Sequence, residues 1–128
     1  MVTLSQPSLI AIVDDDEAIR DATQGLLKAV GYATEAFPSA EDFLASGRLN
    51  DVACLITDIQ MGGMSGLQLQ SQLGSSGFTA PIIVMTAFPE DGGRALAAGA
   101  LCVLGKPFIK DELLSSIRLA LHPGGELN

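Results

Sequence analysis

Five short runs of mostly apolar residues alternate along the chain with longer segments in which apolar and polar residues are mixed. A continuous apolar run is typical of a strand that is buried on both faces of a parallel sheet. One run alternates weakly between apolar and polar positions and still predicts a strand. The five predicted strands cover residues 9–13, 32–37, 52–56, 81–86 and 101–104.

The mixed segments predict five helices, because apolar residues recur there at helical spacing between capping residues and glycine or proline stops. The first helix follows an acidic cap at Asp14–Asp16 and stops at Gly31, and the second opens at Pro38 and Ser39 and stops at Gly47. The third covers residues 65–73 and is closed by Gly74 and the "GSSG" turn, residues 74–77. A short fourth helix ends within residues 94–100, and the last runs from Lys110 to Leu121. Strands joined by helical crossovers imply an α/β fold with a five-stranded parallel sheet and helices on both faces.

A chain of 128 residues predicts a single domain, residues 1–122, with residues 123–128 as a loose tail or the start of a linker. The formal charge of −8 argues against a nucleic-acid surface. Neither a secretory signal nor a membrane-spanning run is visible, so we expect a soluble, cytoplasmic protein without a membrane contact. Cys54 and Cys102 lie inside apolar runs and are expected to be buried free thiols.

Polar residues follow four of the five predicted strands. They are Asp14 and Asp15, Asp58, Thr86 and Lys106. Each alone could be a helix cap, a turn residue or a solvated lysine. Ligands of an open parallel sheet bind outside the carboxyl ends of its strands, so the conjunction predicts a site there. Clustered carboxylates suit Mg²⁺, and a neighbouring lysine and threonine suit a phosphoryl group.

With these residues in place, the chain resembles the response-regulator receiver domains of two-component signalling, in particular those of nitrogen-fixation regulators. The resemblance runs from about Leu9 to Leu121 and implies a doubly wound, flavodoxin-like fold. The segments that carry it are "IVDDDEAIR", "LITDIQMGGMSGLQL", "PIIVMTAF", "LAAGA" and "GKPF". Each segment alone is weakly diagnostic, whereas the five in this order are specific.

The resemblance implies that Asp58 is a phosphoacceptor that receives its phosphoryl group from the phosphohistidine of a sensor histidine kinase. It implies a Mg²⁺ cofactor, for which Mn²⁺ can substitute. Asp15 and Asp58 are expected to bind the metal directly together with the backbone carbonyl of Gln60, and Asp14 mostly through water. The domain would not be an enzyme, although it assists its own phosphorylation and dephosphorylation.

The same resemblance implies that Thr86 provides the switch hydroxyl. It also implies that Lys106 is the lysine that the family carries at its phosphorylation site, joined to Pro107 by a cis peptide. The output is expected on a face made by the fourth helix, the fifth strand and the fifth helix. That face is also a possible homodimer contact.

Three features depart from the family pattern. Gly62 stands where a proline is usual, and Val103 stands where many receivers carry an aromatic switch residue. The spacing between Thr86 and Lys106 is shorter than usual by roughly two residues, about half a helical turn. Gly92–Gly93 also stand where the fourth helix should begin, so we expect that helix to be short or frayed.

Two other functions fit part of the pattern. A haloacid-dehalogenase-like phosphatase also uses an aspartyl-phosphate and Mg²⁺, but its nucleophile follows the first strand and has a second aspartate two residues later. Here Asp58 follows the third strand, and the residue two positions on is Gln60. A degenerate receiver that binds partners without phosphorylation is the other alternative, although all five site residues are present.

Overall fold

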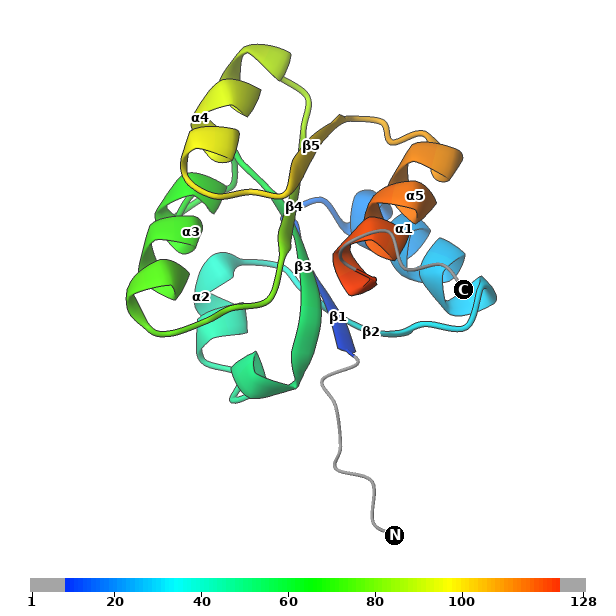
Figure 1. The fold of residues 1–128 in the computed structure, drawn as a ribbon, viewed down its shortest axis with the longest axis horizontal. Helices are drawn as coiled ribbons and strands as arrows, with labels where there is room; N and C mark the ends of the chain where they lie inside the picture. The colour runs from blue at the N-terminus through cyan, green and yellow to red at the C-terminus, as the bar shows by residue number, and fades with distance from the viewer. Residues whose placement is uncertain (1–8, 123–128) are drawn as a thin grey trace, which may run out of the picture.

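The structure is a computed structural model that describes residues 9–122. The predicted tail at residues 123–128 lies outside this range. Figure 1 shows a central sheet with helices on either side. The elements in chain order are β1 (Leu9–Val13), α1 (Glu17–Ala29), β2 (Ala33–Phe37), α2 (Ala40–Leu44), a 3₁₀ turn η1 (Leu49–Asp51), β3 (Val52–Asp58), α3 (Gly66–Ser75), β4 (Ile82–Thr86), a 3₁₀ turn η2 (Pro89–Asp91), α4 (Gly92–Ala97), β5 (Cys102–Gly105) and α5 (Lys110–Leu121).

All strand pairs in the sheet are parallel, and the strand order is β2-β1-β3-β4-β5. Helices α1 and α5 cover one face, while α2, α3 and α4 cover the other (Figure 1). This arrangement confirms the predicted doubly wound α/β fold. The strand order reverses at β1 and β3, so the loops after these two strands diverge and leave room for a site between them.

Each face of the sheet has its own apolar layer. The side chains alternate along β1, so that Ile10 and Ile12 pack with α5 residues such as Ile117, whereas Ala11 and Val13 pack toward α2 and α3. Cys54 is fully buried in the α1–α5 layer, and burial raises the pKa of its thiol to about 12. Cys102 is partly buried, and both cysteines are free. Of the described helices, none has the length and apolarity needed to cross a bilayer.

Capping residues fix where three helices begin. The Asp16 side chain accepts hydrogen bonds from the backbone N–H groups of Ala18 and Ile19 at the start of α1. Ser39 caps α2, and Ser65 caps α3 in a reciprocal capping box with Gln68. These caps place the residues before each helix at the carboxyl edge of the sheet.

Two predicted helix ends are wrong. The third helix was expected to end at Leu73, closed by Gly74 and the turn of residues 74–77, but α3 continues through Gly74 to Ser75. A glycine within a helix costs only about 1 kcal/mol relative to alanine, so Gly74 alone does not stop the helix. Gly77, with φ of +87°, makes the turn within the predicted segment. The second helix ends at Leu44, before the predicted stop at Gly47.

The fourth helix is short, as predicted. It has six residues and begins at Gly92 directly after the η2 turn. Gly92 is buried against β5, and a Cβ at this position would lie 3.2 Å from Cγ1 of Val103. The amide of Gln70, a buried residue of α3, donates a hydrogen bond of 3.1 Å to the carbonyl of Ala95. Helix α4 is therefore held between α3 and β5 by small residues and one side-chain hydrogen bond.

Candidate functional site

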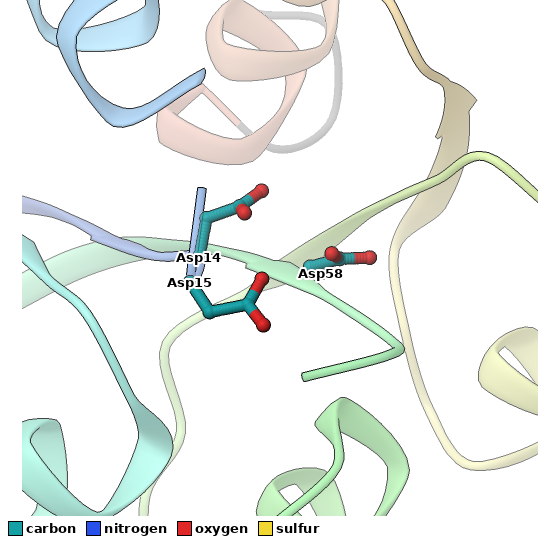
Figure 2. A group of neighbouring side chains, drawn as sticks. All are labelled: Asp14, Asp15 and Asp58. Carbon is teal, nitrogen blue, oxygen red and sulfur yellow. The ribbon is translucent and has the colours of Figure 1, made fainter. Parts of the chain in front are cut away.

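Three carboxylates meet at the carboxyl edge of the sheet (Figure 2). Asp14 follows β1 directly and is 1% exposed, and Asp58 is the last residue of β3 and is 6% exposed. Asp15 is exposed beside them. Because β1 and β3 are adjacent, with Val13 in register with Thr57, the residues that follow them come together. One oxygen from each carboxylate lies within 4.8 Å of the other two.

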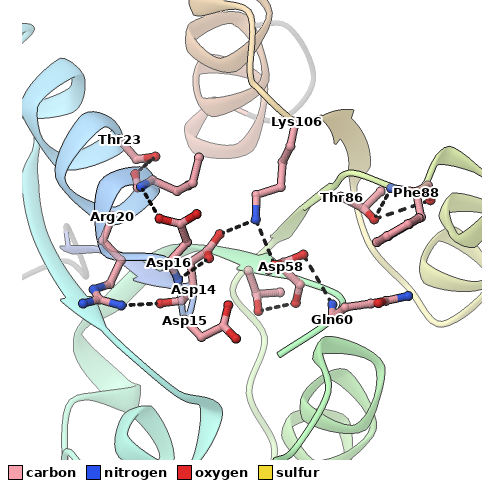
Figure 3. A network of polar contacts seen from close by, with 12 residues as sticks. Asp14, Asp15, Asp16, Arg20, Thr23, Asp58, Gln60, Thr86, Phe88 and Lys106 are labelled. Atoms are coloured by element: carbon pink, nitrogen blue, oxygen red, sulfur yellow. Dashed lines mark hydrogen bonds and ion pairs between the residues drawn. The ribbon is translucent and has the colours of Figure 1, made fainter. Parts of the chain in front are cut away.

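The side chain of Lys106, which follows β5, extends toward this group (Figure 3). Its Nζ donates a hydrogen bond of 2.9 Å to Oδ2 of Asp58 and forms an ion pair of 2.9 Å with Oδ2 of Asp14. The lysine directly follows β5, and its backbone N–H donates to the carbonyl of Thr86. The Lys106–Pro107 peptide is cis, as the resemblance implied.

Burial and charge oppose each other at this centre. Burial raises the pKa of Asp58 above its ordinary value, and the hydrogen bond and charge of Lys106 reduce this shift without cancelling it. Burial alone would lower the pKa of Lys106, but its contacts with Asp58 and Asp14 outweigh burial and raise that pKa. The single ammonium group of Lys106 thus pairs with two of the three clustered carboxylates, those of Asp14 and Asp58.

The donor set fits a small, hard cation. Oδ1 of Asp14 accepts a hydrogen bond from the N–H of Asp16, and its buried Oδ2 has the ammonium group of Lys106 at 2.9 Å. Oxygen atoms within 4.8 Å of one another lie close to the span of a magnesium coordination sphere, whose metal–oxygen distances are about 2.1 Å. The carboxylates of Asp14, Asp15 and Asp58 are therefore placed to share a divalent cation.

Thr86 and Gln60 lie at the side of the site nearest α4. The Thr86 hydroxyl bonds to the backbone of Phe88, accepting from its N–H at 3.0 Å and donating to its carbonyl at 3.4 Å, and it makes no hydrogen bond to Asp58 (Figure 3). The backbone N–H of Gln60 donates to Oδ1 of Asp58, while its side-chain amide donates to Asp91 in η2. Sequence reasoning missed this link between the loop after β3 and the segment that precedes α4.

The loop after β3, residues 59–65, is held closely against the strand that precedes it. Gly66 opens α3 so near the end of β3 that a Cβ on it would lie 2.1 Å from the carbonyl oxygen of Asp58. Its N–H donates to the carbonyl of Ile59 at 2.7 Å. The glycine-rich segment signalled a tight turn in the sequence, but the sequence does not show which atoms approach Gly66.

The comparisons with known proteins agree with this geometry. The sequence model of the response regulator receiver domain matches residues 10–118. The chain belongs to the response regulator receiver family. This match confirms the resemblance inferred from the five motifs. Receiver domains of this family belong to two-component signalling systems.

Several relatives share the receiver domain. The response regulator protein TodT of Pseudomonas putida is 40% identical over 116 residues, which are 89% of this chain and 51% of that protein. The transcriptional regulatory protein FixJ of Azorhizobium caulinodans is 34% identical over 119 residues, 91% of this chain and 56% of that protein. The crystal structure of FixJ-N superposes with a TM-score of 0.82 at 33% identity and covers 96% of this chain and all of that one. The chain thus spans about half the length of the curated relatives that it matches.

Proposed function

We propose that this receiver domain accepts a phosphoryl group on Asp58 from the phosphohistidine of a sensor histidine kinase. The observation that carries this proposal is the pairing of Asp58 Oδ2 with Lys106 at 2.9 Å, beside Asp14 and Asp15 at the end of β3. A buried carboxylate that ends a strand and faces both acidic and basic neighbours is a nucleophile with charge stabilisation close by. We infer that this exchange takes place in the cytoplasm.

The transfer conserves atoms and charge in one exchange. An oxygen of Asp58 attacks the phosphorus atom, and a P–O bond forms as the P–N bond to the kinase histidine breaks. The imidazole nitrogen keeps the electron pair of the broken bond and takes up a proton. Lys106, hydrogen-bonded to Asp58, bears part of the negative charge on the transferred group. The receiver changes only its own carboxylate, so we do not class it as an enzyme.

Magnesium is the proposed cofactor, with Mn²⁺ as a substitute. Asp15 and Asp58 would hold it directly together with the carbonyl of Gln60, and Asp14 would hold it through water. When bound, the ion supplies positive charge to the oxygens of the phosphoryl group. The fit of three clustered carboxylates to a hard cation supports this assignment.

The proposed output is a change on the face formed by α4, β5 and α5. In the structure the Thr86 hydroxyl is bonded to Phe88, so turning toward a phosphoryl group on Asp58 would break these bonds and disturb the start of η2. A groove of about 310 Å³ is lined by residues of both α4 and β5 and includes Thr86 and Val103 in its lining. The apolar side chains of Leu96 and Leu101 are exposed nearby. We infer that this face contacts a partner or a second copy of the domain.

Phosphorylation tests the proposal directly. Incubation with acetyl phosphate and Mg²⁺ should add the mass of one phosphoryl group, measured by intact-protein mass spectrometry. Omission of the metal should abolish the gain, because the carboxylates would otherwise repel the donor. The Asp58→Asn variant should show no gain under either condition. An unchanged gain in that variant would place the phosphoryl group elsewhere and reject the assignment.

Hydrogen exchange tests the output face. We expect amides from Glu90 to Ala98 to exchange rapidly in the unphosphorylated protein, because Gly92 and Gly93 each weaken a helix by about 1 kcal/mol relative to alanine. Phosphorylation should slow this exchange by stabilising the short helix α4 that the structure shows. Amides in α1, on the opposite face of the sheet, serve as the control and should not respond. Equal protection of α4 before and after phosphorylation would contradict this switch.

A further inference from the structure

The loop after β3, residues 59–65, is unusually dependent on contacts from outside itself. It contains the adjacent glycines Gly62 and Gly63, and the latter has φ of +90°. Glycine gives a chain more conformations to lose on ordering than any other residue. The loop also carries Gln60, whose carbonyl belongs to the proposed metal site. Its position must therefore be fixed by its neighbours.

Several hydrogen bonds tie the loop to the rest of the domain, among them those of Gln60 with Asp58 and with Asp91. At its base, Gly66 N–H donates to the carbonyl of Ile59 at 2.7 Å. On the side of the acidic cluster, Gly62 N–H donates to Oδ2 of Asp15 at 3.3 Å. On the side of α2, Met64 N–H donates to Oε2 of Glu41 at 2.9 Å.

The hydrogen bond to Glu41 is the shortest of the three that join the loop to neighbouring carboxylates outside β3. It measures 2.9 Å, against 3.2 Å for the bond from Gln60 to Asp91 and 3.3 Å for the bond from Gly62 to Asp15. A carboxylate acceptor strengthens a hydrogen bond from a backbone N–H. The hydrogen bond from Met64 lowers the pKa of Glu41, which agrees with an ionised acceptor. A Cβ at Gly63 would lie 2.9 Å from the same Oε2, so the Glu41 carboxylate lies close beside the loop.

We propose that Glu41 is a positioning residue for the metal site, which holds the loop after β3 so that the Gln60 carbonyl faces the acidic cluster. The inference rests on the proposed function, because it concerns the same Mg²⁺. Glu41 does not touch the cluster itself. It acts through its hydrogen bond from the Met64 N–H, and it thereby links α2 to the site.

Glu41→Ala tests the proposal, with Mg²⁺ alone as the probe. Isothermal titration of the unphosphorylated protein should show an affinity about three- to tenfold weaker, less than the tenfold to hundredfold typical for a group bonded directly to a metal ligand. The Met64 amide should exchange faster by NMR. Glu41→Gln, which keeps a carbonyl acceptor in place, should recover most of the affinity.

Asp42→Ala is the matched control. Asp42 lies in the same first turn of α2 and carries the same charge, but its side chain makes no hydrogen bond or ion pair within residues 9–122. This variant should leave both the Mg²⁺ affinity and the Met64 exchange unchanged. Faster Met64 exchange in Glu41→Ala with unaltered Mg²⁺ affinity would overturn the inference and leave the proposed function standing. A wild-type protein that bound no Mg²⁺ would overturn both.

Discussion

Replacing Lys106 with methionine should tighten Mg²⁺ binding and slow phosphoryl transfer. The ammonium lies 2.9 Å from oxygens of both Asp14 and Asp58, so it neutralises two of the three carboxylates of the proposed metal site. A unit charge about 4 Å away changes the binding free energy by about 1 to 4 kcal/mol, depending on the local dielectric. We therefore expect Mg²⁺ affinity to rise about tenfold. Transfer from acetyl phosphate should slow by about a hundredfold, because a group that stabilises developing charge is lost.

Lys110→Met is the matched control for the charge change. Lys110 opens α5, is exposed, and forms no ion pair in the described part of the chain. Calorimetric titration gives the affinity, and a mass-spectrometric time course gives the rate. Weaker Mg²⁺ binding in Lys106→Met would contradict our reading of the electrostatics, since it would mean that the lysine organises the carboxylates more than it competes with the cation.

Gly66→Ala should destabilise the domain by more than about 3 kcal/mol, beyond the 1–3 kcal/mol typical of an overpacked site. The added Cβ would lie 2.1 Å from the carbonyl oxygen of Asp58, and this obstacle is backbone, which cannot rotate away. Either α3 must move off the sheet or the end of β3 must bend. Urea unfolding of the metal-free protein measures the change.

Gly74→Ala, in the same helix, should have the opposite sign. Gly74 is exposed within α3, and a Cβ there would meet no atom within 4 Å. Alanine should stabilise the domain by about 0.5–1 kcal/mol, because it loses less backbone entropy on folding. If both variants shifted stability equally, the close approach at Gly66 would not be the cause.

The sequence predicted the arrangement of the site better than the details of its support. Asp14, Asp58 and Lys106 each follow an apolar run, and parallel strands bring the ends of such runs to one edge. That logic needs only the hydrophobic pattern. The third helix runs to Ser75 because a glycine within a helix costs only about 1 kcal/mol relative to alanine, which is too little for Gly74 alone to end it.

Contacts that depend on a side chain meeting a distant backbone left no pattern in the sequence. Glu41 is one of several acidic residues at helix starts, and nothing in its neighbourhood along the chain points to Met64. The same holds for the link from Gln60 to Asp91. The hydroxyl of Thr86 was expected to act as the switch, but its partner in this structure, the backbone of Phe88, depends on one rotamer and could not be predicted from the sequence pattern.

The order in which the site residues occur along the chain has a consequence during synthesis on the ribosome. Asp58 and Lys106 are 48 residues apart, and β5 and α5 are made after every carboxylate of the cluster. A nascent chain that ends before β5 holds the three acidic groups without their ammonium partner. It also lacks the α5 side chains that cover Ile10 and Ile12 in the core. An incomplete receiver domain is therefore expected to be a poor phosphoacceptor. We expect the domain to become able to accept a phosphoryl group only after β5 and α5 have been synthesised.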